Sequence, residues 1–247
     1  MSGVQITWLR ECRAFRGSFS CAIPVSAFLA VCGWSFVAAL RQAEGSVLQL
    51  QTIWGVSVAP WLPILGAVLT MRLFADERAT GMIELLLSAP IRERDLVVGK
   101  FLSALTVVAF ALLLTMAAPA FLLPFLSEPL AHAFRLVPFL ATYAILLLQA
   151  AVWCAAGMMV SAFCRNQAAS AVTSLILCSG LPVAGYVAIL FWFPSLRASM
   201  GTFPILTHVY DFSTGLFSTG VLCAYGVAML FFLFVCSKRL AFLRLKG

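Results

Sequence analysis

Ten of the 25 charged residues lie within residues 72–100, in the stretch MRLFADERATGMIELLLSAPIRERDLVVGK. Its central acids, Asp76, Glu77 and Glu84, stand close together with Arg78 beside them. Acids of this kind can form ion pairs with basic residues of a partner protein. Because the chain on either side is almost free of charge, this segment is the first candidate for a functional site.

ATP binding and hydrolysis are not predicted for this chain. Gly99 and Lys100 resemble the end of a phosphate-binding loop, which needs Ser or Thr next and another Gly five residues before the first. Phe101 and Arg94 occupy those positions instead. His208 is followed three residues later by Asp211, but one such pair does not make a catalytic set. We therefore expect no catalytic residue.

Metal binding is not predicted either. The eight cysteines include no CxxC pair, and the chain has only two histidines. We interpret the cysteines as small apolar residues in a reducing compartment, so no structural disulfide is expected.

The composition indicates a polytopic membrane protein. The 247 residues are 63% hydrophobic and 10% charged, with a mean hydropathy of +1.04, whereas soluble domains are about 25% charged. The net charge of +7 is explained by basic residues that flank apolar spans. No water-facing basic stretch carries interleaved aromatic residues, which argues against nucleic-acid binding.

Six apolar runs are long enough to cross a membrane, which takes about 20 residues. They are residues 21–40, 53–71, 101–126, 137–163, 168–193 and 219–237. No run contains Asp, Glu, Lys, Arg or His, which argues against an ion-coupled carrier. With no internal repeat, residues 1–247 are predicted to form one all-α domain.

The basic residues predict the orientation of these spans. Thirteen Lys and Arg residues fall on the side of the termini and of the 72–100 segment, and three fall on the other side. By the positive-inside rule, both termini and the charged segment are expected in the cytoplasm.

Residues 1–20 are predicted to form an interfacial helix. On a helical period Trp8, Cys12, Phe15 and Phe19 form one stripe. The alternative is a simple basic anchor, and the two are compatible. The residues that we expect to anchor the protein at the membrane surface are Trp8, Arg10, Arg13, Arg72, Lys100, Lys238 and Arg239.

Residues 75–89 are predicted to form a short amphipathic helix on the cytoplasmic side. Ala79, Met82, Ile83 and Leu86 share one face, and Glu77, Gly81 and Glu84 share the other. Asp76 and Glu77 lie where negative charge complements the helix dipole, and Pro90 ends the helix. The alternative is a solvated loop.

Residues 194–218 form an unusually apolar outer segment that contains His208, Asp211, Phe212 and Gly215. We expect one or two short helices there, in the outer leaflet or packed over the exit of a dimer. The alternative is an extension of the last span that begins near Tyr210.

The run LTMRLFADERATGMIELLLSAPIRERDLVVGKF resembles the first intracellular loop of type-2 ABC exporter permeases, most closely the gliding-motility-type branch. The matching residues are Thr70, Met71, Arg72, Asp76, Glu77, Arg78, Gly81, Glu84, Leu86, Pro90, Gly99 and Lys100. Met82 stands where Thr is usual, and Asp76 where Glu is common. LRECRAFRGSFSCAIPVSAFLAVCGWSF resembles the N-terminal helix and first span, and LTHVYDFSTGL resembles the segment before the last span.

This resemblance implies a permease subunit in the bacterial inner membrane that catalyses no reaction itself. Its loop helix would be a coupling helix that docks on a separate cytoplasmic ABC ATPase, where ATP and magnesium bind. The coupling residues would be Asp76, Glu77, Arg78, Gly81, Met82, Glu84 and Leu86. Two copies, or this chain with a related one, would enclose the pathway, most simply for export. The alternative is a mechanical subunit that relays ATP-driven motion without moving a substrate.

Overall fold

The computed structural model describes residues 3–16, 19–42, 50–82, 92–122, 135–164, 166–180, 182–184, 187 and 204–244. In these residues all regular structure is helical, which confirms the predicted all-α class. Six helical stretches are long and apolar enough to cross a membrane, as predicted. They are Cys21–Gln42, Leu50–Ala79, Glu93–Thr115, Leu136–Phe163, Gln167–Ala184 and Thr219–Arg244.

The elements follow one another without strands in the described ranges. In chain order they are α1 (Gly3–Arg16), α2 (Phe19–Gln42), α3 (Leu50–Val58), η1 (Ala59–Trp61), α4 (Leu62–Thr70), α5 (Ala75–Ala79), α7 (Glu93–Thr115), α8 (Ala117–Leu122), α10 (Leu136–Phe163), α11 (Gln167–Leu175), η3 (Ile176–Gly180), α14 (Pro204–Thr214) and α15 (Thr219–Arg244).

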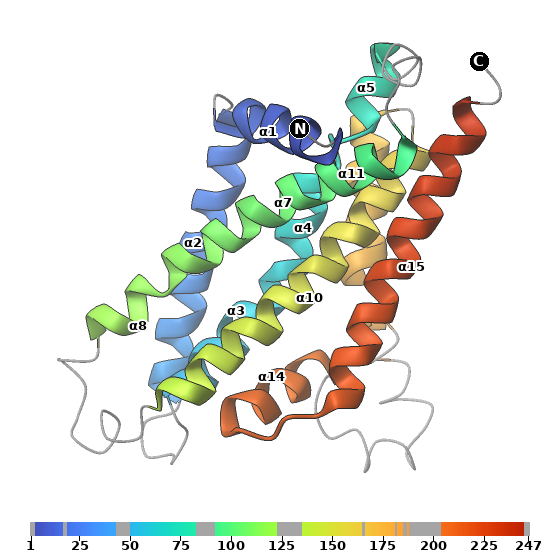
Figure 1. Ribbon diagram of the computed structural model, residues 1–247. Helices are drawn as coiled ribbons and strands as arrows, with labels where there is room; N and C mark the ends of the chain where they lie inside the picture. The colour runs from blue at the N-terminus through green and yellow to red at the C-terminus, as the bar shows by residue number, and fades with distance from the viewer. Residues whose placement is uncertain are drawn as a thin grey trace.

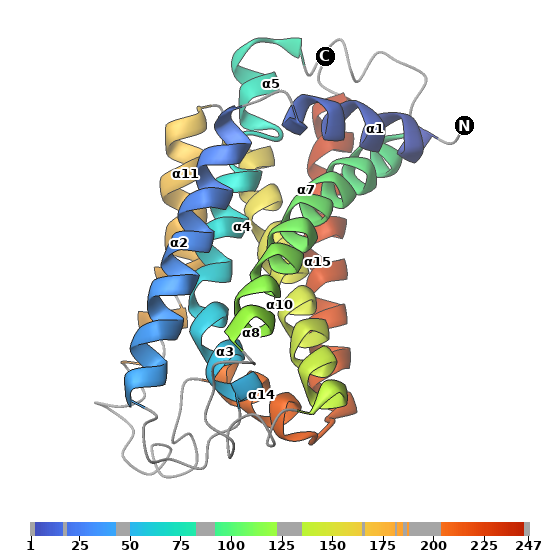
Figure 2. The ribbon, with the colours of Figure 1, turned by 90° about the vertical axis from the view of Figure 1, so that its left-hand side faces the viewer.

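The spanning helices form a bundle around α10, which packs against α4, α7, α11, α14 and α15. Helix α1 lies across one end of the bundle, where α5 and the C-terminal end of α15 also lie, whereas α14 lies across the opposite end (Figure 1 and Figure 2). We call these the α1 end and the α14 end.

The second span is not one continuous α-helix. A single 3-10 turn, η1, separates α3 from α4, with Pro60 inside it and Pro63 at the start of α4. Proline has no backbone N–H and clashes with the preceding turn, so the α-helical ladder is interrupted where these prolines occur. In the same way the fifth span passes from α11 into one π-helical stretch, η3, before Pro182.

Helix α7 begins at Glu93 rather than at residue 101, where the apolar run begins. Its first two turns mix charged and apolar residues, and Glu93 and Asp95 lie in the first turn, where they complement the helix dipole. Lys100 therefore lies inside this helix and not at its start. An apolar run marks the lipid-crossing part of a helix, and here the helix extends further.

Helices α4 and α10 approach closely through small residues. A Cβ on Gly157 would lie 2.2 Å from Thr70 Oγ1, and one on Gly66 would lie 3.1 Å from Trp153 Cβ. The Thr70 hydroxyl donates to the Gly66 carbonyl at 2.7 Å and so stays within its own helix. Small residues let membrane helices pack closely where lipid removes the usual hydrophobic drive.

Gly157→Ala is expected to lower the midpoint of thermal unfolding in detergent, because the added methyl would overlap Thr70 and overpacking costs about 1–3 kcal/mol. Gly226→Ala is the matched control, since no atom lies within 4 Å of an added Cβ in this other spanning helix. Its midpoint should stay unchanged or rise slightly. Equal midpoints for the two variants would contradict the close packing of α4 and α10.

Candidate functional site

Ser161 of α10 fixes the turn that joins α4 to α5. Its hydroxyl oxygen accepts the backbone N–H groups of Phe74 and Ala75, each at 3.1 Å. The same hydroxyl donates to the Met71 carbonyl at 3.0 Å. One buried serine thus satisfies three main-chain groups where no helix ladder can reach them.

Arg78 makes a second attachment between α5 and α10. Its Nη1 donates to the carbonyl of Ala162 at 2.8 Å and to that of Cys164 at 3.3 Å. These are the carbonyls at the end of α10, which have no intrahelical partner and favour a cation. Arg78, which the sequence motif assigns to coupling, therefore fastens α5 to the bundle.

The continuous helix expected over residues 75–89 is wrong at Gly81. Helix α5 ends at Ala79, and Gly81 has a φ of +72°. This left-handed conformation is accessible to glycine at little cost and ends helices. Ala79 and Met82, which the helical period placed on one face, are therefore separated by a turn. Met82 follows the turn and is 53% exposed, and residues 83–91, with Glu84 and Leu86, lie outside the described residues.

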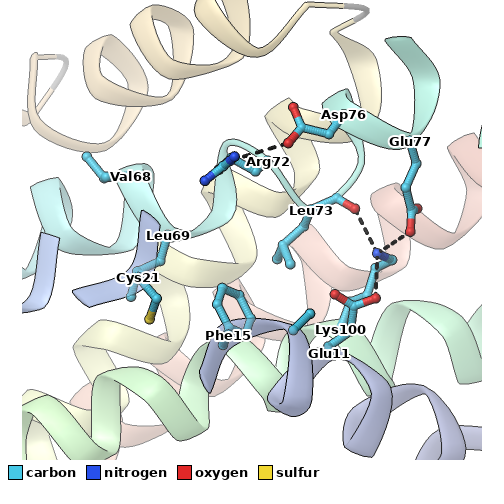
Figure 3. Close-up of a pocket in the computed structure, with 11 residues that line it drawn as sticks. Glu11, Phe15, Cys21, Val68, Leu69, Arg72, Leu73, Asp76, Glu77 and Lys100 are labelled. Carbon is cyan, nitrogen blue, oxygen red and sulfur yellow. Dashed lines mark hydrogen bonds and ion pairs between the residues drawn. The ribbon is translucent and has the colours of Figure 1, made fainter. Parts of the chain in front are cut away.

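A cluster of charges centred on the buried Lys100 joins three helices at the α1 end, and Figure 3 shows Lys100 with Glu11 and Glu77. Lys100 Nζ of α7 lies 2.8 Å from Glu77 Oε1 of α5 and 3.1 Å from Glu11 Oε1 of α1. It also donates to the Leu73 carbonyl at 2.8 Å. The Lys100 side chain is only 1% exposed, so its ammonium exchanges water for these three oxygens.

Arg10 completes this charge cluster, which we define as Arg10, Glu11, Glu77 and Lys100. Arg10 Nη2 lies 2.7 Å from Glu11 Oε1 and 3.2 Å from Glu77 Oε1. Each carboxylate therefore meets two cations, and the four charges sum to zero. Burial disfavours the ionised Glu11, but Lys100 and Arg10 outweigh burial and hold the pKa of Glu11 below its ordinary value.

Gly99 explains how α1 can approach so closely. A Cβ at this position would lie 2.7 Å from Thr7 Cβ and 3.1 Å from the Val4 carbonyl oxygen of α1. The glycine thus lets α1 cross directly over α7, and the next residue, Lys100, reaches the acid on α1. The Gly-Lys pair of the motif serves helix crossing and ion pairing.

The expectation that Lys100 anchors the protein at lipid phosphate is therefore wrong. The Lys100 ammonium can be buried because two carboxylates and a carbonyl replace its water shell. Arg72 is also paired within the chain, with Asp76 at 3.3 Å, although both side chains are about two-fifths exposed. An exposed pair of this kind contributes little to stability.

The other expected anchors remain near the surface of the α1 end. Trp8 donates from Nε1 to Thr106 Oγ1 at 3.1 Å, and Arg13 is exposed. Lys238 Nζ lies 5.3 Å from the ring centre of Phe234, and the Arg239 guanidinium lies 5.0 Å from that of Phe163. Contact of these residues with lipid stays a prediction.

A cavity of about 230 Å³ opens beside the charge cluster. Phe15 and Leu69 line one side of it, and the other side is lined by the charged residues Glu11, Arg72, Asp76, Glu77 and Lys100 (Figure 3). In the described part of the chain, no three His, Cys, Asp or Glu residues are grouped so that they could hold a metal. The arrangement is suited to holding helices together.

Ser161 and Glu11 are site residues that the sequence analysis did not single out, and a sequence signal exists for Glu11. It lies three residues after Trp8 and four before Phe15, so it falls on the apolar stripe of the N-terminal helix. It is also the only acid in the first 43 residues. An isolated acid on an apolar face is the signal that could have indicated a buried cation nearby.

The expected outer segment contains helix α14 at the opposite end of the bundle. Gly215, with a φ of +93°, ends this helix, and the Leu216 N–H donates to the Asp211 carbonyl across it at 2.8 Å. The last span begins afresh at Thr219, so the alternative of an extension from near Tyr210 is wrong. Phe212 is buried in the core. Residues 194–203 lie outside the described residues.

Polar contacts hold α14 to the bundle. His208 Nδ1 and the Tyr225 hydroxyl of α15 lie 2.9 Å apart, and Gln149 Nε2 of α10 donates to the Ile205 carbonyl at 3.1 Å. Burial lowers the pKa of His208, and the nearby Asp211 opposes that shift in part. His208 thus helps to attach α14 to α15.

A protein-family model described as "ABC-2 family transporter protein" matches residues 19–197. This chain belongs to the ABC-2 family of transporters. The family and the six apolar helices make it a multi-pass permease subunit of an ABC transporter, which works with an ABC ATPase. The match includes Glu77 and Lys100 but begins after Glu11. Among curated proteins, no sequence matches the chain at a significant level. The gliding-motility branch rests on the loop motif alone.

Lys100→Met is expected to lower the free energy of unfolding of this ABC-2 permease by about 3–5 kcal/mol, because two carboxylates would stay buried without their ammonium. Adding Glu11→Gln to the same chain should restore part of the loss. Denaturant unfolding in detergent of the native chain, both single variants and the double variant gives the coupling energy. Strict additivity would contradict a direct interaction between Glu11 and Lys100.

Acid should remove the contribution of Glu11. Its folded-state pKa lies below the ordinary 4.5, so the stabilisation is fully present above the unfolded pKa and is lost as the pH falls through the folded one. The stability difference between the native chain and Glu11→Gln is therefore expected to shrink on acidification below pH 4.5. A difference that grows on acidification would contradict the ion pair.

Proposed function

We propose that this permease subunit couples export across a bacterial inner membrane to ATP hydrolysis, and that segment 75–89 is where a cytoplasmic ATPase subunit acts. ATP and magnesium would bind to that partner. Two permease subunits, identical or related, would enclose the pathway. The observation that carries the proposal is the double attachment of α5, to α10 on one side and to α1 and α7 on the other.

This attachment supplies a route for force. Ser161 and Arg78 fasten α5 and its preceding turn to the end of α10. Glu77 fastens α5 to Lys100 and, through Arg10, to α1. A displacement of α5 would thus be transmitted to two spanning helices and to α1 at the same time. Packed side chains and ion pairs transmit such displacements when the elements they join are rigid.

The residues of the segment divide between inward and outward roles. Glu77 and Arg78 point into contacts within the chain, whereas Met82 is 53% exposed and the Asp76 side chain is 40% exposed. We assign Met82 and Asp76 to the surface that meets the ATPase. An exposed apolar side chain can enter a groove of a partner, and an exposed acid can pair with a basic residue at its rim.

The shared position of α1, α5 and the C-terminal end of α15 agrees with the basic-residue asymmetry of the sequence. All three lie at the α1 end, away from α14 (Figure 1). Cytoplasmic Lys and Arg set the orientation of membrane proteins. We therefore assign the α1 end to the cytoplasm and α14 to the outer side.

Cysteine labelling tests this orientation. In a Cys223→Ser background, Thr80→Cys is expected to react with a membrane-impermeant maleimide only after the inner membrane is permeabilised, and Leu216→Cys before it. Both positions are exposed. The background without an added cysteine gives the blank, and the opposite labelling pattern would rule out the assignment.

Met82→Glu is expected to weaken binding of a co-expressed ABC ATPase subunit at least tenfold, which is about 1.4 kcal/mol, because a charge would enter an apolar groove. Leu216→Glu, the same change at an exposed site of the α14 end, is the control. Co-purification and ATPase activity in vesicles are the measurements. Undiminished binding by Met82→Glu would contradict the docking surface.

The same vesicles separate export from a mechanical role. ATP-dependent uptake of a candidate cargo into inside-out vesicles would fit export. ATPase activity that depends on Met82 without any uptake, over a panel of lipid, polysaccharide, peptide and drug-like cargoes, would favour a subunit that relays motion.

A further inference from the structure

A groove runs beneath α1, between α2 and α7, and is separate from the charge cluster. Its volume is about 590 Å³, within the range of about 300–1,000 Å³ that is usual for ligand sites. Phe15 and Trp8 of α1 form its roof, and Val25 of α2 and Phe110 of α7 lie along its sides. Figure 2 shows the three helices that enclose it.

The lining is apolar except at the end nearest α1. There Arg13 lines the groove, and its side chain is exposed. Arg13 forms no ion pair with an acid in the described ranges, in contrast to Arg10, whose guanidinium meets Glu11 and Glu77. The groove therefore combines apolar walls with one uncompensated positive charge.

We propose that this groove binds an anionic phospholipid of the surrounding bilayer, with one acyl chain beneath α1 and the phosphate at Arg13. Apolar walls between two spanning helices match an acyl chain, and a guanidinium matches phosphate in charge and in hydrogen-bond geometry. Basic pockets between membrane helices bind acidic headgroups in this way. One site thus offers apolar walls for an acyl chain and a positive charge for a phosphate.

The position of α1 supports a bilayer lipid as the occupant. α1 lies across the end of the bundle (Figure 2), and Trp8 has the amphipathic ring that favours the membrane–water interface. Its indole N–H is bonded to Thr106 of α7, which fixes the roof above the groove. A lipid can thus enter sideways from the hydrocarbon and leave its headgroup at the surface.

The bound lipid would brace the helix that carries Glu11. Phe15 and Cys21 line both the groove and the cavity beside the charge cluster, so an acyl chain contacts the corner between α1 and α2 from the side opposite the cluster. The charge cluster joins α1 to α7, and the lipid would support α1 from within the groove. This role does not depend on the assignment of the ATPase surface.

Quenching of Trp8 by brominated lipid tests the proposal. The full chain is placed in phosphatidylcholine vesicles with increasing fractions of brominated phosphatidylglycerol or brominated phosphatidylcholine. The Trp8 signal is the difference between the native chain and Trp8→Phe. Phosphatidylglycerol is expected to reach half-quenching at about a fivefold lower fraction, because a basic residue near the surface contributes about 1 kcal/mol.

Variants locate the site. Arg13→Gln should remove the preference for phosphatidylglycerol and Arg13→Lys should keep it, while Lys238→Gln, an exposed basic residue at the same end, should leave it unchanged. Ala22→Phe, which fills the groove from α2, should reduce quenching by both lipids. Equal quenching by the two lipids in the native chain, equal effects of Arg13→Gln and Lys238→Gln, or no effect of Ala22→Phe would each overturn the proposal.

Discussion

A lysine ammonium that has lost its water must find fixed oxygens, and this requirement organises the α1 end of the protein. Lys100 is 1% exposed, and an unpaired ammonium at such a site would cost several kcal/mol. Its three oxygens come from three different segments: Glu11 on α1, Glu77 on α5 and Leu73 in the turn between α4 and α5. If any of these segments moved away, the Lys100 ammonium would lose one of its oxygen partners. All three segments are therefore held in one place.

The rest of the site is arranged so that this pairing can form. Gly99 removes the side chain that would keep α1 away from α7. Ser161 and Arg78 attach the α5 region to α10 and so hold Glu77 within reach of Lys100. Arg10 supplies the second cation, without which two carboxylates would share one ammonium. The short helix that bears the family motif is thus part of a framework that includes α1, outside the residues that the family model matches.

Periodicity and apolar runs were enough to predict the fold class, because crossing a membrane requires about 20 apolar residues in a helix. They could not predict the contacts of Lys100. A Gly-Lys pair just before an apolar run has the same sequence pattern whether the lysine reaches lipid phosphate or a carboxylate on another helix. The break at Gly81 was missed because a helical period tolerates one glycine, and only the φ of +72° reveals the turn. The residues that join separate helices were the hardest to find. Sequence spacing carries no record of which helix lies beside which.

The zero net charge of the cluster has an electrical consequence. Moving one elementary charge through the membrane potential involves about 2.3 kcal/mol per 100 mV. Two carboxylates and two cations that move together carry no net charge, so a shift of the four linked groups along the membrane normal does almost no work against that potential. The membrane potential would then neither assist nor oppose a movement of the charge cluster. The free-energy cost of that movement would be the same in an energised and in a depolarised cell.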